Sequence, residues 1–239
     1  MTTHIVAAGG GGFSMAPDGM PTALDRYLVE LTGKSAPLVC FAPTASADDP
    51  QYINRFLMAY SQLHVRPSVL TLWGNAGSSL ERLKEADLVL IGLGSTVNLV
   101  ALWQAHGVDA ILRTRMDRGD DFVIGGIAAG AGCFFQGSVT DTFGDARAWA
   151  GGFGLLPGSF CSHFDGKGQY APVYTEAVAT GGLPGGFACD DGAGIHYVDG
   201  EVRGFVTERD GAGVYSVMPT TEPTASGVLV EAEEMAALQ

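Results

Sequence analysis

Apolar residues in the first half of the chain fall into short blocks that alternate with stretches of helical spacing. The apolar blocks predict strands at His4–Ala8, Leu38–Ala42, Ser68–Trp73, Asp87–Ile91 and Phe122–Ile127. The stretches between them predict helices at Thr22–Leu31, Gln51–Leu63, Ser79–Lys84, Thr96–His106 and Val108–Arg118. Strands that alternate with helices in this way are typical of a mainly parallel sheet that helices cover on both faces.

The last third of the chain has a different pattern. Strands are predicted at Ser159–His163 and Gly186–Cys189, with a helix near Pro172–Ala179 between them. Three later segments alternate apolar and polar residues and predict antiparallel hairpins at a sheet edge: Ile195–Val198, Val202–Thr207 and Val214–Val217. No Pro- or Ser-rich linker and no internal repeat divides the sequence. We therefore expect one domain over residues 1–239, a three-layer α/β/α fold.

The composition narrows the classes of function. Hydrophobic residues make up 46% of the chain and the mean hydropathy is +0.19, so a large core can form and a disordered chain is excluded. Thirteen Lys and Arg against 26 Asp and Glu give a net charge of −13. Such a surface repels phosphate backbones and anionic lipids, so we expect no nucleic-acid partner and no membrane partner.

The cysteines and the N-terminus predict a cytoplasmic protein. Four cysteines stand singly, none in a C-x-x-C pair, which is typical of reduced core thiols. No signal peptide and no apolar stretch of membrane-spanning length is visible. The glycine run Gly9–Gly12 would need another glycine at Ser14 to resemble a dinucleotide loop, so it predicts a tight turn beside a pocket. No cofactor and no metal site are expected.

The most informative segment joins the strand Phe122–Ile127 to a short predicted helix, Ala128–Gln136. Residues Gly126–Gly130 read G-x-A-x-G, which becomes the nucleophile elbow G-x-S-x-G if the central alanine is replaced by serine. The elbow needs small residues two positions before and after the nucleophile, because the turn is strained and crowded. Glycines are common where strands meet helices, so this motif alone is weak.

Further motifs give the segment a context. They are Gly126–Ala131, the loop Gly92–Thr96, the stretch Gly152–His163 and the turn Asp190–Ala193. Together they resemble the peptidase E and cyanophycinase family of serine hydrolases, from the opening glycine loop to about Tyr197. The resemblance implies a flavodoxin-like fold of the class I glutamine amidotransferase type, and a serine-type peptidase that hydrolyses short peptides by a Ser-His-Asp mechanism. It also implies a homodimer.

The resemblance assigns roles residue by residue. It places the general base at His163, at the end of a predicted strand, and the carboxylate that orients this base at Asp141. Asp145 and Asp191 are rival carboxylates for that role. Asp165 is too close to His163 in the chain to orient its ring.

The same resemblance places an oxyanion-binding and substrate-binding segment beside the elbow. The backbone N–H of Ala129 is one expected donor of hydrogen bonds to an oxyanion. A second donor is expected from the loop that contains Gly92, Gly94 and Ser95.

Three features depart from the family pattern. The nucleophile position holds Ala128, and a methyl group cannot attack a carbonyl carbon. Leu93 stands where the family usually has glycine, and Lys167 is the only cation in the segment after His163, where relatives with acidic substrates use arginine. Cys133 and Cys161 are possible substitute nucleophiles, although both are expected in the core.

Two explanations of Ala128 remain open. The chain can be a peptidase that was deliberately disarmed at its nucleophile, or a natural pseudoenzyme that binds peptides or small acyl ligands. The retained histidine and oxyanion loop favour the disarmed enzyme, because a decaying site is free to lose them as well.

Overall fold

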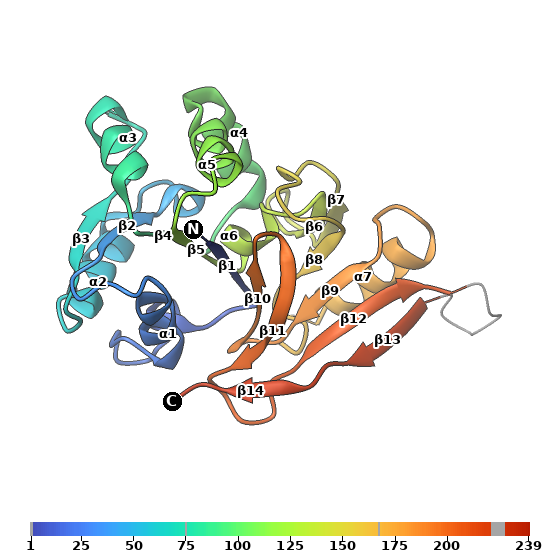
Figure 1. The fold of residues 1–239 in the computed structure, drawn as a ribbon. Helices are drawn as coiled ribbons and strands as arrows, with labels where there is room; N and C mark the ends of the chain where they lie inside the picture. The colour runs from blue at the N-terminus through green and yellow to red at the C-terminus, as the bar shows by residue number, and fades with distance from the viewer. Residues whose placement is uncertain (1, 75, 167, 221–227) are drawn as a thin grey trace.

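The computed structural model describes residues 2–74, 76–166, 168–220 and 228–239 and contains a large mixed sheet (Figure 1). Its strands are β1 (Thr3–Ala8), β2 (Leu38–Ala42), β3 (Arg66–Val69), β4 (Leu88–Ile91), β5 (Phe122–Ile127), β10 (Ala193–Val198), β11 (Glu201–Thr207) and β14 (Met235–Ala237). The order is β14-β11-β10-β1-β5-β4-β2-β3. The five strands from β1 to β3 run parallel, and β10 and β11 add the antiparallel part at one side.

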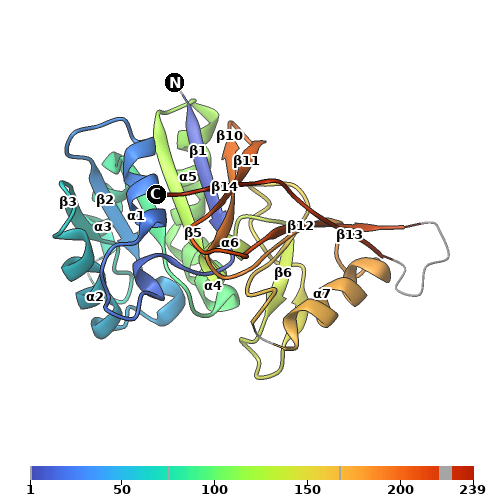
Figure 2. The same cartoon turned by 90° about the horizontal axis from the view of Figure 1, so that it is seen from below.

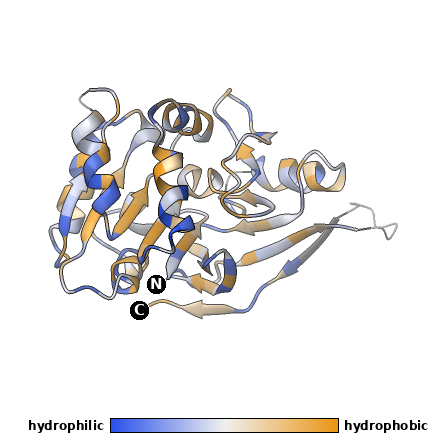
Figure 3. Cartoon of the chain, turned by 45° about the horizontal axis from the view of Figure 1, so that its top comes forward, coloured by the Kyte–Doolittle hydropathy of each residue, from blue (hydrophilic) through white to orange (hydrophobic). Residues whose placement is uncertain are grey.

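Helices cover both faces of this sheet. The helices are α1 (Ala23–Leu31), α2 (Pro50–Tyr60), α3 (Ala76–Glu85), α4 (Thr96–His106) and α5 (Val108–Asp117). Helices α1 and α2 pack on one face with Val6 and Ala8, while α3, α4 and α5 pack on the other with Ile5 and Ala7. Successive residues of a strand thus enter opposite layers of the core. In Figure 3 the central strands are mostly orange, and blue lies mainly on the helices and loops around them.

Local sequence signals fix where several helices begin. Asp49 caps α2 by accepting hydrogen bonds from Gln51 N and Tyr52 N, and Pro50 occupies the first helical position. The hydroxyl of Ser95 accepts from Asn98 N and caps α4. The predicted strands Leu38–Ala42 and Phe122–Ile127 and the predicted helix Thr96–His106 have the expected bounds.

The last third forms the predicted antiparallel edge with β10 and β11, and it also forms a second sheet that the sequence pattern does not predict. A second sheet contains β6 (Gly137–Thr140), β7 (Arg147–Trp149), β8 (Ser159–Cys161), β9 (Gly186–Cys189), β12 (Val214–Pro219) and β13 (Val228–Ala232). Its order is β13-β12-β9-β8-β6-β7, and β8 is parallel to both of its neighbours. Helix α7 (Tyr170–Ala179) covers one face of this sheet. Its other face joins the core of the first sheet through residues such as Phe160 and Val214.

The predicted helix Ala128–Gln136 is much shorter in the structure. Helix α6 spans only Ala129–Gly132. After it the chain must reach β6, and Phe134 and Phe135 turn into the core at 0% exposure. Burial of two adjacent aromatic side chains overrides helical continuation here.

The C-terminal segment belongs to both sheets (Figure 2). Strand β13 pairs antiparallel with β12 of the second sheet, and β14 pairs parallel with β11 of the first. No helix in the described part of the chain has the length and apolar character needed to span a membrane.

Candidate active site

Five strand ends meet at one place in the molecule. In the first sheet, Ala8 pairs with Ile127 and Ile91 pairs with Gly126, so Gly9, Gly92 and Ala128 all follow the carboxyl ends of adjacent parallel strands. In the second sheet, β8 and β9 are also parallel and end at Cys161 and Cys189. Their following turns carry His163 and Asp191. The carboxyl edge of a parallel sheet is where α/β proteins place their functional groups.

The elbow turn is strained and closely packed. Ala128 has φ 50° and ψ −105°, a conformation that costs an L-residue about 1–3 kcal/mol. A Cβ on Gly126 would lie 2.4 Å from the carbonyl oxygen of Gly130. A Cβ on Gly130 would lie 2.4 Å from the carbonyl oxygen of Ile91. The two glycines of the motif are therefore required by close backbone contacts.

Tyr52 of α2 packs against the loop that begins at Gly92. A Cβ on Gly92 would lie 2.7 Å from the Tyr52 ring, and the backbone N–H of Leu93 donates to the Tyr52 hydroxyl at 3.3 Å. Burial raises the pKa of Tyr52 to about 12, so the hydroxyl stays protonated. The side chain of Ser95 caps α4 and contacts Thr142 Oγ1 at 2.9 Å. Of the predicted loop residues, Gly94 lines the pocket described below and Gly92 and Ser95 support it.

His163 pairs with Asp191. Its Nδ1 lies 2.5 Å from Oδ1 of Asp191, and the imidazole is buried. An ionised Asp191 accepts the Nδ1 proton, which leaves Nε2 as the ring nitrogen that can take a proton. The rings of His163 and Tyr170 are nearly perpendicular, with a centroid distance of 6.1 Å. The structure does not bring the predicted carboxylate, Asp141, to Nδ1 of His163, and the rival carboxylate Asp191 occupies that place.

Asp141 has a different environment. It follows β6 on the connection to β7, is exposed, and lines the pocket beside the elbow, where the hydroxyl of Tyr170 hydrogen-bonds to it. Asp141 and His163 line the same pocket, but Nδ1 of His163 contacts Asp191, and Asp141 contacts Tyr170 instead. The other rival, Asp145, is exposed on the same connection.

The glycine run Gly9–Gly12 packs against the turn that carries Asp191. A Cβ on Gly9 would lie 2.3 Å from the carbonyl oxygen of Cys189, and one on Gly10 would lie 2.1 Å from Oδ1 of Asp191. Any larger residue at position 10 would displace the carboxylate that contacts His163. The run is thus a tight turn beside the site, as the sequence predicts.

A pocket of about 210 Å³ opens over the elbow. Ala128, Ala129 and His163 line it together with Gly94, and Asp141 and Tyr170 stand at its side. This volume is below the 300–1,000 Å³ of sites for drug-sized ligands, so the pocket suits a small group. Lys167, the cation that follows His163 in the sequence, lies outside the described residues. Among the described residues, no cluster of three or more His, Cys, Asp and Glu side chains could hold a metal ion.

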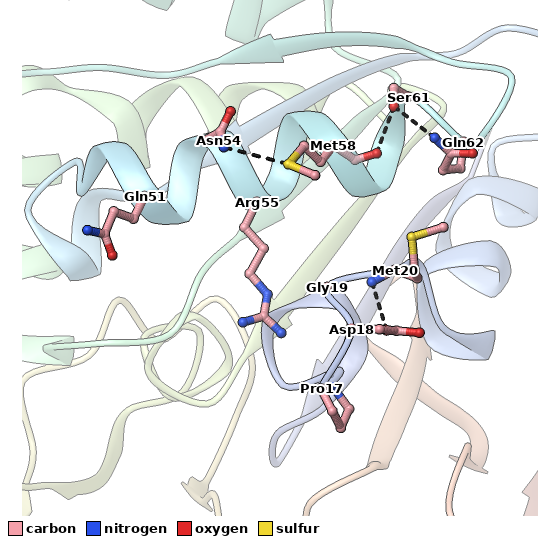
Figure 4. Close-up of a pocket in the computed structure, with 10 residues that line it drawn as sticks. All are labelled: Pro17, Asp18, Gly19, Met20, Gln51, Asn54, Arg55, Met58, Ser61 and Gln62. Carbon is pink, nitrogen blue, oxygen red and sulfur yellow. Dashed lines mark hydrogen bonds between the residues drawn. The ribbon is translucent and has the colours of Figure 1, made fainter.

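A larger hollow of about 390 Å³ lies elsewhere, between the 17–20 loop and α2 (Figure 4). Arg55, which lines this hollow, donates to the backbone carbonyl oxygens of Phe13 and Ala16. Neither the elbow nor the His163–Asp191 pair contributes to this hollow. We therefore locate the candidate site at the smaller pocket.

The two cysteines considered as nucleophiles are enclosed in the core. Cys133 and Cys161 are both fully buried, and burial raises the pKa of each thiol well above its usual range. The Cys133 thiol donates to the carbonyl oxygen of Gly130 at 3.1 Å. A neutral, enclosed thiol is a poor nucleophile, which supports the prediction that these residues belong to the core.

Some residues of the site carry no clear signal in the sequence. Tyr52 and Tyr170 come from helices α2 and α7, and nothing in their local sequence distinguishes them from core tyrosines. Asp191 did carry a signal, because it lies in the acidic-glycine turn Asp190–Ala193 that resembles the family. Geometry across two sheets was needed to choose it over Asp141.

Comparisons with known proteins show the family of the chain. A family model described as peptidase family S51 matches residues 5–205. The uncharacterized peptidase YgaJ of Bacillus subtilis strain 168 is 40% identical over 216 residues, which are 90% of this chain and 92% of that protein. The resemblance to peptidase E is thereby confirmed.

Solved structures agree on the fold. A protein described as a peptidase E from Listeria monocytogenes EGD-e has a TM-score of 0.61 at 15% identity, over 84% of this chain and 97% of that one. A peptidase from an acI-B1 Actinobacterium has a TM-score of 0.65 at 14% identity, over 97% and 96% of the two chains. The flavodoxin-like α/β fold is confirmed. The family model and the 40% identical relative show that the chain belongs to peptidase family S51.

Proposed function

We propose that this chain has the site of a serine-type peptidase for short peptides, in a form that lacks its nucleophile. One observation carries the proposal: Ala128 occupies a strained elbow turn and lines the same pocket as His163. The Nδ1 atom of His163 contacts Asp191, which leaves Nε2 for proton transfer. Packing alone gives no reason to keep a side chain at a positive φ, since glycine would relieve the strain.

A serine at position 128 would supply the missing atom. Its Oγ would attack the peptide carbonyl carbon while Nε2 of His163 takes the hydroxyl proton, and Asp191 would stabilise the imidazolium that forms. The same Nε2 would then give the proton to the leaving amine. Water would attack the acyl-enzyme ester by the same route, releasing the acid and restoring the serine.

Two backbone donors are suited to the oxyanion. The N–H of Ala129 opens α6, where no helical carbonyl precedes it to accept a hydrogen bond. In the facing loop, Gly92 N donates to Ala42 O, Leu93 N to Tyr52, and Ser95 N to Ala45 O. Gly94 lines the pocket, so its N–H is the donor that we assign to this loop.

The charge of the pocket bears on the substrate. Asp141 is the acidic residue of the described pocket lining, which contains neither lysine nor arginine. An acidic side chain of a substrate would lie near the Asp141 carboxylate. It would find no cationic side chain in the described lining with which to form an ion pair. We therefore propose short peptides without an acidic residue at the scissile bond, rather than aspartyl peptides.

The substitution Ala128→Ser tests the proposal. We expect serine-type hydrolysis of some di- or tripeptides, inhibition by serine-directed reagents, and loss of activity in the double variant with His163→Ala. The parent should bind the same peptides with negligible turnover. If the serine form folds normally and stays inert over a broad panel, the proposal is wrong.

A matched pair of amides distinguishes the two carboxylates within the Ala128→Ser background. Asp191→Asn should lower kcat by about 10⁴-fold, the effect known for the orienting carboxylate of a Ser-His-Asp triad. Asp141→Asn should keep kcat within about tenfold, because this side chain contacts Tyr170 and the pocket instead of His163. The reverse order would restore Asp141 as the orienting residue.

The second candidate is a natural pseudoenzyme that binds peptides or small acyl ligands. Ala128 itself favours it, since the pocket and donors can bind a carbonyl group without attacking it. A parent chain that binds peptides, combined with an inert Ala128→Ser form, would support this function.

A further inference from the structure

Asp165 and Arg209 form a closed set of hydrogen bonds around the backbone of Asp191. The backbone N–H of Asp191 donates to Oδ1 of Asp165 at 3.0 Å, and Nε of Arg209 donates to the backbone carbonyl oxygen of Asp191 at 2.8 Å. The ring closes because Nη2 of Arg209 donates to Oδ2 of Asp165. We name these three bonds the Asp165–Arg209 ring.

The ring joins three segments that are distant in the sequence. Asp165 lies in the turn after β8 that also carries His163, and Gly166 N donates to the carbonyl oxygen of His163 at 3.2 Å. Asp191 lies in the turn after β9, and Arg209 lies just beyond β11 of the other sheet. The turns that supply His163 and Asp191 are therefore fastened to each other and to the first sheet at this point.

The anchor at Arg209 is itself fixed. Its backbone N–H donates to Oγ1 of Thr207 at 3.2 Å, and the same hydroxyl donates to its carbonyl oxygen at 2.8 Å. The next residue back, Glu208, accepts from Gly12 N at 2.8 Å and from Leu24 N at 2.9 Å. The end of β11 thus holds the glycine run and the Asp191 turn together.

An ion pair at this exposure contributes little to global stability. The side chains of Arg209 and Asp165 are 49% and 32% exposed, and such pairs stabilise a fold by only about 0–1 kcal/mol. The ring instead restrains the backbone N–H and the backbone carbonyl oxygen of Asp191. It fixes the direction of the Cα–Cβ bond of Asp191, whose carboxylate already packs closely on Gly10.

We propose that Asp165 and Arg209 are positioning residues that hold the Asp191 carboxylate on His163. This inference rests on the proposed function, in which Asp191 orients the base. It gives Asp165 a role other than direct contact with the imidazole: Asp165 acts through the backbone of the residue that makes this contact. A displacement of a catalytic group by about 1 Å can lower the reaction rate by two orders of magnitude.

The test uses the Ala128 chain as it exists, labelled with ¹⁵N-histidine. The readout is the NMR resonance of the His163 Nδ1 proton, assigned by its loss in His163→Gln. The variants are Arg209→Gln, Arg209→Lys and Asp165→Ala. Arg66→Gln is the matched control, because it removes another exposed arginine whose carboxylate partner, Asp87, lies 3.7 Å away and outside the site.

We expect the Nδ1 proton to exchange with water at least about tenfold faster in Arg209→Gln and Asp165→Ala, at an unchanged thermal midpoint. Arg209→Lys should give a smaller increase, because an ammonium group lacks the planar two-sided geometry. The control should match the parent. In the Ala128→Ser background the same two variants should lower kcat about tenfold or more while KM stays within about threefold.

Two results would overturn the positioning role. An unchanged Nδ1 proton in both Arg209→Gln and Asp165→Ala would show that the ring does not hold the pair, and the proposed function would be unaffected. A parent without this resonance, and with Nδ1 and Oδ1 beyond hydrogen-bond reach in a crystal structure, would remove the pair itself and the proposed mechanism with it. An inert Ala128→Ser chain whose NMR results are as expected would remove the proposed function alone.

Discussion

His196 is held in its uncharged form by its surroundings. The imidazole lies on β10 with 7% exposure, and both ring nitrogens are engaged: Nδ1 with the Tyr27 hydroxyl at 2.8 Å and Nε2 with Nδ1 of His4 at 2.9 Å. Burial, with smaller contributions from the charges of His4 and Arg203, lowers the pKa of His196 to about 4. The unfolded chain can protonate this residue from about pH 6.5 downward, whereas the folded chain resists it.

This difference predicts an acid-dependent loss of stability. Between pH 6.5 and 4 the unfolded state binds the His196 proton and the folded state does not, so the free energy of unfolding falls as the pH falls. We expect His196 to contribute on the order of 2 kcal/mol of this loss between pH 7 and 4.5. Urea unfolding of the parent and of His196→Gln at both pH values measures it.

The comparison needs the variant because another residue acts in the opposite direction. Burial raises the pKa of Asp25 to about 6, so the folded state binds this proton more readily and gains relative stability as the pH falls. The quantity that isolates His196 is therefore the change with pH in the parent minus the change in His196→Gln. Equal changes in the two proteins would contradict the prediction.

The turns of the candidate site depend on glycines, which have no side chain to clash with the neighbouring backbone. Strand β5, the elbow and α6 can pack against β4 only because position 130 has no Cβ. We expect Gly130→Ala to lower the free energy of unfolding by about 3 kcal/mol, since its Cβ would lie 2.4 Å from a backbone oxygen in a central strand that cannot move away. Chemical denaturation measures the loss.

A glycine on β11 provides the matched control. A Cβ on Gly204 would meet no atom within 4 Å, so Gly204→Ala should change the free energy of unfolding by less than about 1 kcal/mol. If the two substitutions had equal effects, close contact at the elbow would not be the reason for its glycine.

The helices and strands differ in how well the sequence pattern predicts them. The buried strands and long helices were predictable because a continuous apolar block or a 3.6-residue period marks them, as in Phe122–Ile127 and Thr96–His106. The strands β6 and β7 carry no such mark: β6 reads Gly-Ser-Val-Thr and β7 has three residues. Their existence depends on pairing with β8 and with each other, which a local pattern does not contain.

The candidate site was predictable to the same degree. The elbow and His163 follow from local motifs, each within one strand and its turn. The choice among Asp141, Asp145 and Asp191 depends on how two sheets are placed, and the motif that carried Asp191 did not state its partner. Functional side chains gather at the carboxyl edge of a parallel sheet, so the sequence predicts on which edge they lie. It does not predict which of them contact one another.

At the scale of the whole molecule, the C-terminal segment fastens the two sheets together. Strand β13 covers the edge of β12, and β14 covers the edge of β11. Removal of residues 228–239 would expose both edges, which are templates for pairing with other chains. We expect this truncation to lower the thermal midpoint by roughly 5 °C or more and to cause concentration-dependent aggregation.

A shorter truncation separates the two contributions. Removal of residues 233–239 deletes β14 and leaves β13 in place, so the loss should be smaller and only the edge of β11 should be exposed. Differential scanning calorimetry and light scattering measure both effects. A full truncation that is as stable and as free of aggregation as the parent would contradict this function of the segment. The homodimer and the cytoplasmic location stay predictions of the sequence.

The strained turn at Ala128 also has a genetic consequence. Every alanine codon becomes a serine codon through a single base change at its first position. Because the backbone at position 128 already has the conformation of an elbow, with Gly126 and Gly130 retained around it, that one mutation would need no second change to place a hydroxyl group in the pocket. If the natural gene encodes Ala128, a population that carries it is one point mutation away from the serine form, and selection for growth on a short peptide tests whether that form arises.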